Sequence, residues 1–241
     1  MKYLVSLVLI GILVLGCSEE TIEVDGTVEG LEYFPVQEGN EWVYEYDSIV
    51  YDENKGIIDT NSGFIREVVF DSEVDGSFKI ERSFRKKVDD SWVVTDIWSG
   101  RLEDRRAIRT EENLSFIKLV FPPNLNVNWD GNALFDQNVE IVIAGEPLRP
   151  YQGWDYQIVG NEGSYSYEGF QSDDVIDVLQ VDETSLIDRR YSLERFARGG
   201  GLVEKELRLL ECQCISVPAS VPWEEKAEKG VILYQRLISF N

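Results

Sequence analysis

The chain has 241 residues, of which 23 are Lys or Arg and 45 are Asp or Glu, so its formal net charge is −22 at pH 7. Such an acidic surface repels phosphate backbones, which excludes nucleic-acid binding as a function. The chain contains no histidine. Ser-His-Asp and Cys-His catalytic arrangements and histidine-containing metal sites are therefore excluded as well.

The first element is an apolar run within MKYLVSLVLIGILVLGC at the N-terminus. Lys2 supplies a positive start, and the run from Tyr3 to Leu15 has the length of a signal peptide rather than of a membrane span. The ending at Cys17 resembles the lipobox of bacterial lipoproteins. The resemblance implies that residues 1–16 are a signal peptide and that Cys17 is the lipid attachment site, carrying palmitate-type chains. An uncleaved anchor and a plain secretory signal are the alternatives.

Residues 17–32 are acidic and show little apolar pattern, so we expect a lipidated flexible tether. Ser18-Glu19-Glu20 resembles the acidic export signal of surface lipoproteins of the Bacteroidota. This resemblance implies an outer-membrane protein that is attached through its lipid. Both the cell surface and the periplasmic face remain open.

Residues 33–241 are expected to form a single all-β domain, because apolar and polar residues alternate with period two and helix-period stretches are rare. The expected strands are 42–49, 78–84, 139–143 and 231–238, the last two being nearer to a core. The expected turns are 54–56, 75–76, 130–132, 161–163 and 199–201, where Gly, Asn and Asp tolerate positive φ. The one expected helix is 223–229, between Pro222 and Gly230.

Short strands joined by hairpin-type turns predict an antiparallel sheet. We expect a curved or barrel-like sheet, either lipocalin-like or a half-barrel, with a two-sheet β-sandwich as the alternative. FPVQEGNEW at 34–42 and FPPNLNVNW at 121–129 share a Phe-Pro pair followed by Trp at the same spacing. This echo predicts an internal duplication that divides near residue 120, with chance as the alternative.

Two segments, YFPVQEGNEWVYEYDS and ERFARGGGLVEKE, resemble elements of lipoproteins of the Bacteroidota that have no known activity. The first matches through Tyr33, Phe34, Pro35, Gly39, Asn40, Trp42 and Tyr44. The second matches through Glu194, Phe196, Ala197, Gly199, Gly201, Leu202 and Val203. The resemblance implies the compartment and the fold class, and no catalytic residue.

Two further segments have residues typical of a special site, an acidic loop and a pair of cysteines, and each also has a simpler structural explanation. Asp71 to Gly76 begins like an EF-hand calcium loop, but Arg82 occupies the twelfth position where the loop needs glutamate, which favours a hairpin turn. Cys212 and Cys214 at positions i and i+2 of a strand would have Cα atoms close to the upper limit for a disulfide, and a bond would distort the strand. We therefore expect two buried free thiols, with a pair that is reactive to oxidants as the alternative. No cofactor or metal site is predicted.

Aromatic residues dominate the remaining candidates for a site. Trp42, Tyr44, Trp129 and Trp154 are expected either to line a ligand cavity or to anchor the core. The sequence favours a non-catalytic binding domain for an apolar molecule or a glycan. The alternatives are an envelope module that docks another protein and a carboxylate-dependent glycan hydrolase. An enzyme is not expected, because no carboxylate pair stands out among the 45 acidic residues.

Overall fold

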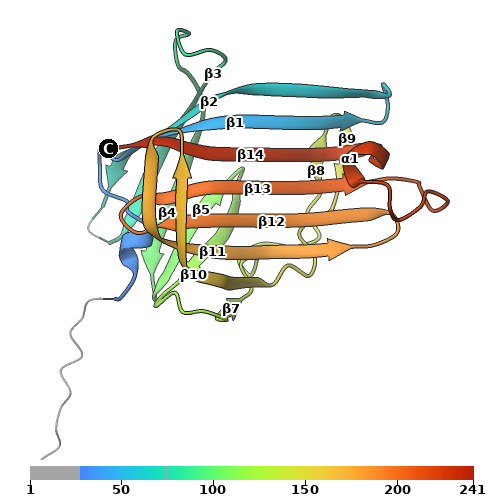
Figure 1. Cartoon of the computed structure of the whole chain (residues 1–241). Coiled ribbons are helices and arrows are strands. Elements are labelled where there is room, and N and C mark those ends of the chain that lie inside the picture. Colours follow the sequence, from blue (N-terminus) through green and yellow to red (C-terminus); the bar gives the residue numbers. More distant parts are fainter. Residues whose placement is uncertain (1–27, 74) are drawn as a thin grey trace, which may run out of the picture.

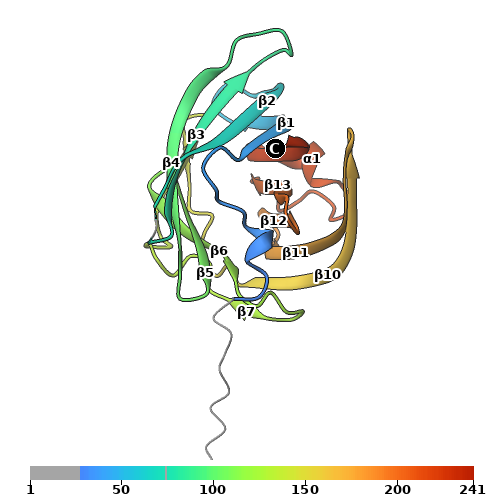
Figure 2. The same cartoon turned by 90° about the vertical axis from the view of Figure 1, so that its left-hand side faces the viewer.

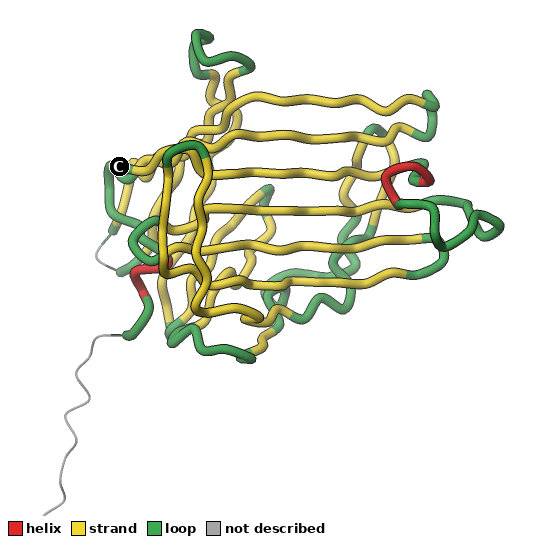
Figure 3. The backbone as a smooth tube through the Cα atoms, in the orientation of Figure 1, coloured by secondary structure: helices red, strands yellow, loops and turns green. Residues whose placement is uncertain are grey.

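The computed structural model describes residues 28–73 and 75–241, and strands make up most of them (Figure 3). The elements are a 3-10 turn (Leu31–Tyr33), β1 (Glu41–Asp52), β2 (Ile57–Ser72), β3 (Ser77–Arg85), β4 (Val93–Glu103), β5 (Arg106–Glu111), β6 (Leu114–Val120), β7 (Asn128–Trp129), β8 (Ile141–Ile143), β9 (Glu146–Leu148), β10 (Tyr156–Tyr167), β11 (Phe170–Thr184), β12 (Asp188–Ala197), β13 (Gly201–Glu211), α1 (Trp223–Lys226) and β14 (Lys229–Phe240). Among these residues no helix has the length and hydropathy of a membrane span.

Twelve of the described strands form one antiparallel sheet in the order β6-β5-β4-β3-β2-β1-β14-β13-β12-β11-β10-β7. The sheet curls until its two edges meet, as the view along the strands shows (Figure 2). Across this seam Ile117 N–H donates to the Gly131 carbonyl at 2.8 Å, and Trp129 Nε1 donates to the Ile117 carbonyl at 2.7 Å. The predicted barrel-like, antiparallel all-β fold is confirmed, in the form of a single continuous sheet rather than a sandwich of two.

Alternation in the sequence places every second side chain inside the barrel, as the pleat of a strand requires. In β1, Trp42 and Tyr44 are buried while Val43 and Glu45 are less so. The strands predicted at 42–49, 78–84 and 231–238 are confirmed within β1, β3 and β14. The prediction of a strand near the core at residues 139–143 is wrong. Only Ile141–Ile143 is extended, in a separate pair with β9, and Val142 is 69% exposed.

Most of the predicted turns lie where glycine has the positive φ that other residues avoid. Gly56 closes the β1–β2 hairpin with φ 62°, and Gly76 closes the β2–β3 hairpin with φ 84°. The β2–β3 hairpin includes residues 71–76, the segment that begins like an EF-hand loop. The prediction that this segment is a hairpin turn is therefore confirmed. Residues 130–132 turn after β7. Residues 198–200 turn between β12 and β13, so the turn predicted at 199–201 is displaced by one residue, and Gly201 begins β13.

The turn predicted at 161–163 is wrong, because these residues lie inside β10. The pairing of β10 with β11 shifts register three times between Ile158 and Tyr165, so the glycines there build bulges. The hairpin bends at this point, and its outer half crosses the outside of the sheet (Figure 1). Tyr167 holds it there through a hydrogen bond to Glu45 and through Arg236, whose guanidinium lies 4.9 Å from the ring centroid.

Two further predictions need correction near the C-terminus. The helix starts at Trp223 as predicted but ends at Lys226, because Glu228 N–H already donates to Glu211 as the sheet resumes. Cys212 and Cys214 form a disulfide with Cα atoms 5.1 Å apart, so the prediction of free thiols is wrong. The prediction placed both cysteines on a strand, but β13 ends at Glu211 and both cysteines lie after it, outside any strand.

The segment from Val28 to Asn40 closes one end of the barrel (Figure 2). Gly199 N–H donates to the Glu32 carbonyl at 2.7 Å, and Phe34 packs between Phe78 and Phe196. Residues 28–32 therefore lie against the barrel. The folded part includes them, although the sequence analysis placed the start of the domain at residue 33. Cys17 and the predicted signal peptide lie outside the described residues.

Candidate functional site

A cavity of about 320 Å³ lies inside the barrel, toward the end away from the N-terminal segment. This is the lower end of the size range of small-molecule sites. Its wall is aromatic and its floor is polar. The aromatic residues are Trp98, Phe116, Tyr151, Trp154 and Tyr156. The polar residues of the floor are Glu111, Lys118, Gln180, Ser192 and Lys205.

The aromatic wall is held by ring contacts and by hydrogen bonds to groups outside the cavity. The Tyr151 ring lies 5.6 Å from Phe116 and 5.3 Å from Trp154, centroid to centroid, in edge-to-face geometry. Trp154 Nε1 donates to the Pro150 carbonyl at 2.5 Å, and the Tyr156 hydroxyl donates to Asn132 Oδ1 at 3.2 Å. Since these polar atoms already have partners, the two side chains offer mainly ring surface to a ligand.

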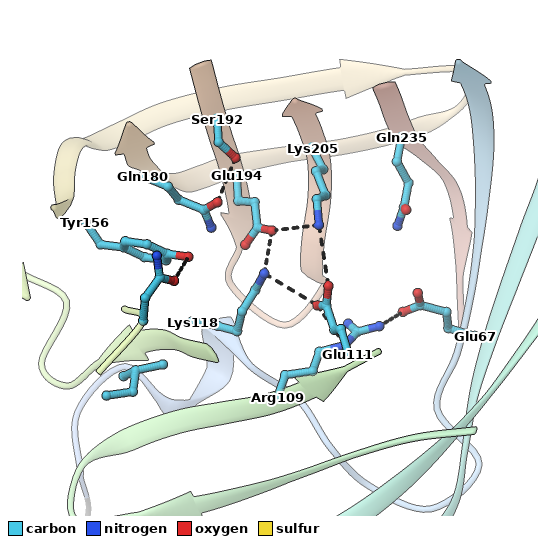
Figure 4. Close-up of polar contacts among 12 residues, drawn as sticks. Glu67, Arg109, Glu111, Lys118, Tyr156, Gln180, Ser192, Glu194, Lys205 and Gln235 are labelled. Atoms are coloured by element: carbon cyan, nitrogen blue, oxygen red, sulfur yellow. Dashed lines mark hydrogen bonds and ion pairs between the residues drawn. The ribbon is translucent and has the colours of Figure 1, made fainter. Parts of the chain in front are cut away.

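The floor is a ring of ion pairs between facing walls of the barrel (Figure 4). Lys118 on β6 donates to Glu194 Oε1 on β12 at 2.5 Å, and its ammonium lies 3.5 Å from Glu111 on β5. Lys205 on β13 lies 3.4 Å from Glu194 and 3.6 Å from Glu111. Each carboxylate thus faces both ammonium groups, which is the pairing that buried charges require.

The ring continues deeper into the barrel through two arginines. Arg109 donates to Glu67 at 2.6 Å, and its Nε lies 3.4 Å from Glu111. Arg82 also pairs with Glu67. The guanidinium carbons of Arg82 and Arg109 lie 4.3 and 4.7 Å from the Trp98 ring centroid, so this indole adds cation–π contacts to the network.

The surroundings fix the charges of the network. Burial raises the pKa of Glu111, but Lys118 and Lys205 lower it more, so the net pKa lies well below the usual range. Glu67 follows the same pattern, with Arg109 and Arg82 as the groups that lower its pKa. Burial lowers the pKa of Lys205, but Glu111 and Glu194 raise it above its ordinary value. These three groups are therefore charged at neutral pH.

Two residues that line the cavity have a buried polar atom without a hydrogen-bond partner among the described residues: Gln180, at Nε2, and Trp98, at Nε1. Gln180 is only 2% exposed, and its Oε1 accepts a hydrogen bond from Ser192 Oγ at 2.7 Å. This bond orients the amide and leaves its nitrogen without a partner. Buried polar groups in folded proteins are usually paired, and these two N–H groups can donate to a group bound in the cavity.

The structure separates the four aromatic residues that the sequence singled out. Trp154 lines the cavity. Trp129 lies behind the wall, 5.8 Å from the Tyr156 ring. Trp42 and Tyr44 belong to the core at the other end, where they donate to the carbonyls of Gly200 and Leu202. Trp42 and Trp129 each lie in a strand that follows a Phe-Pro pair, and the internal duplication stays a prediction.

The charged floor was missed, although the sequence carries a signal for it. Glu67 stands between the buried residues Ile65 and Val69 at the spacing of one strand face. Lys118 interrupts an apolar run in the same way. A charge at an inward position of a strand predicts a buried partner of opposite sign. Among the described residues, no group of three or more His, Cys, Asp or Glu side chains is arranged to hold a metal ion.

Fold and site together define a barrel-like all-β protein with an aromatic-walled, charged cavity. No protein-family model matches the chain, and no curated protein matches it. Among solved structures it is similar to a candidate lipoprotein from Parabacteroides distasonis, with 14% sequence identity and a TM-score of 0.42. That similarity covers 87% of this chain and 98% of the other.

Proposed function

We propose that this chain is a lipid-anchored, non-catalytic binding protein of the bacterial outer membrane that holds a small amphipathic molecule in its barrel cavity. The observation that carries the proposal is the Gln180 amide nitrogen, which has no hydrogen-bond partner among the described residues and is buried at the floor of an aromatic-walled cavity. Cavities of this kind, mostly apolar with a few placed polar groups, are the usual form of small-molecule sites.

The anchor is supported by the lipobox-like sequence that ends at Cys17 and by the acidic residues after it. One acyl chain binds membranes only marginally, so stable attachment requires the several chains that a lipoprotein cysteine carries. Ser18-Glu19-Glu20 supports the outer membrane over the inner one. The cell surface and the periplasmic face are both compatible with these residues.

The charges of the floor favour binding over glycan hydrolysis. A hydrolase of the two-carboxylate type needs one carboxylic acid with a raised pKa to protonate the leaving group. The pKa of Glu111 is instead lowered, mainly by Lys118 and Lys205, and Glu194 accepts a hydrogen bond from Lys118. Docking of another envelope protein remains the alternative.

Native mass spectrometry of the full chain, purified from its own membrane, tests the cavity. We expect a reproducible extra mass on the wild type and its loss in Leu207→Trp, which fills the cavity with a larger side chain. Ile57→Trp, on an exposed position of β2, is the matched control and should keep the extra mass. A bare wild-type mass would contradict the proposal. Peptide mass spectrometry of the N-terminus tests the anchor separately, with Cys17→Ser as the unlipidated control.

A further inference from the structure

The network beneath the cavity does not balance its own charge. Its cations are Arg82, Arg109, Lys118 and Lys205, and its carboxylates are Glu67, Glu111 and Glu194. Four cations against three carboxylates leave one positive charge inside a protein whose net charge is −22. An uncompensated buried charge is costly, so a site with this balance favours an anion.

Lys205 is the cation that is positioned to receive this anion. Lys118 donates to Glu194, and Arg109 donates to Glu67. Lys205 has only the two ion pairs at 3.4 and 3.6 Å, no side-chain hydrogen bond within the described part of the chain, and a side chain that is 20% exposed. Its ammonium therefore keeps donors for a group in the cavity that it lines.

Two other residues of the cavity have N–H donors without a partner among the described residues, and these donors specify the rest of the ligand. Gln180 Nε2 and Trp98 Nε1 are hydrogen-bond donors of residues that line the same cavity, so a ligand that pairs with them must carry acceptor oxygens. Two more carboxylates line the cavity, but Glu112 is exposed to solvent, and Glu140 is exposed and pairs with Arg149 at 2.6 Å.

We infer that the ligand is a monocarboxylate, whose carboxylate accepts hydrogen bonds from Lys205 and Gln180 and whose ring or apolar body lies against the aromatic wall. The bound carboxylate brings the charge of the network to zero. This inference rests on the proposed function, since it names the chemistry of the molecule in that cavity.

Isosteric acid and amide pairs test the inference, because the two members differ in charge and little in shape. The full chain is titrated with 2-naphthylacetate and 2-naphthylacetamide, and separately with glucuronate and glucuronamide, and binding is followed by native mass spectrometry. At least one acid should bind at least about tenfold more tightly than its amide. The naphthyl pair represents an apolar body, and the glucuronate pair a body with hydroxyl groups.

The outcomes separate the inference from the proposed function. If the amides bind as tightly as their acids, the inference that the ligand is a monocarboxylate is wrong, and the proposal that the cavity binds a small molecule is unaffected. If no member of either pair binds, both the cavity function and the inference fall. In Lys205→Met the preference for the acid should disappear, whereas Lys205→Arg should keep it. The matched control is Lys79→Met, on the exposed face of β3, which should bind like the wild type.

Discussion

Lys118 on β6 and Glu194 on β12 are 76 residues apart in the chain, yet the ammonium and the carboxylate meet at 2.5 Å inside the barrel. Both side chains are buried, with 5% and 0% of their surface exposed. The pair joins the two halves of the sheet across its interior. Because buried ions without partners are expensive, this contact fixes how the two walls face each other.

Removing one member of this pair should destabilise the barrel strongly. In Lys118→Met, Glu194 keeps only Lys205, and we expect the free energy of unfolding to fall by about 3 kcal/mol. The double variant Lys118→Met with Glu194→Gln should lose less than the sum of the single variants, since no unpaired carboxylate remains. Urea unfolding followed by circular dichroism measures both. Additive losses would show that the two residues do not interact.

Glu67 predicts a defined dependence of stability on pH. Arg109 and Arg82 hold the pKa of Glu67 below the ordinary glutamate value of 4.5, against the opposing effect of burial. The unfolded state therefore binds the proton more readily, and the stabilisation is present above about pH 4.5 and is lost as the pH falls through the folded-state pKa. The difference in unfolding free energy between wild type and Glu67→Gln should shrink below pH 4.5. A difference that grows on acidification would contradict the assignment.

The buried tyrosines should make the protein less stable as the pH rises in the alkaline range. Burial raises the pKa of Tyr44 and Tyr156 well above 10.0, and burial with the Asp174 hydrogen bond raises that of Tyr33 to about 12. Their neutral forms stabilise the fold fully below the unfolded pKa near 10, and this stabilisation is lost as the pH rises through the folded values. Absorbance at 295 nm should show fewer ionised tyrosines at pH 10.5 in the native protein than in guanidinium chloride.

Gly131 is expected to tolerate no side chain. A Cβ at this position would lie 2.5 Å from the Tyr156 ring, next to the seam that closes the barrel. Gly131→Ala should therefore cost about 2 kcal/mol of stability and displace the aromatic wall. Gly163→Ala is the control, because its Cβ would meet only ordinary contacts at 3.4 Å or more. Thermal melting of the two variants should separate them clearly.

The sequence predicts the fold class because the rule behind it is local. The alternation of buried and less buried residues in Trp42-Val43-Tyr44-Glu45 predicts a single strand, and each turn glycine predicts a single hairpin. Local rules failed at residues 161–163, because glycines that permit a turn also permit a bulge within a strand. They failed at Cys212 and Cys214 because the end of a strand was misplaced by a few residues.

The candidate site was less predictable, because its residues come from strands far apart in the chain. An inward charge such as Lys118 is visible in the sequence, but its partner depends on which strands face each other in the closed barrel. Trp154 was identified for its aromatic character alone, which it shares with the core residue Trp42. Alternation separates inside from outside, and it does not separate a cavity wall from a packed core.

The closed end of the barrel has a consequence for how a ligand would arrive. β6 runs from Leu114 at the cavity to Val120 at the end where Val28 enters, and the exposed cavity residue Glu112 lies beyond its far end. A lipid at Cys17, as proposed, would attach the protein through the closed end. With the anchor at that end, a ligand would reach Lys205 by diffusion through water and would not have to leave the bilayer sideways.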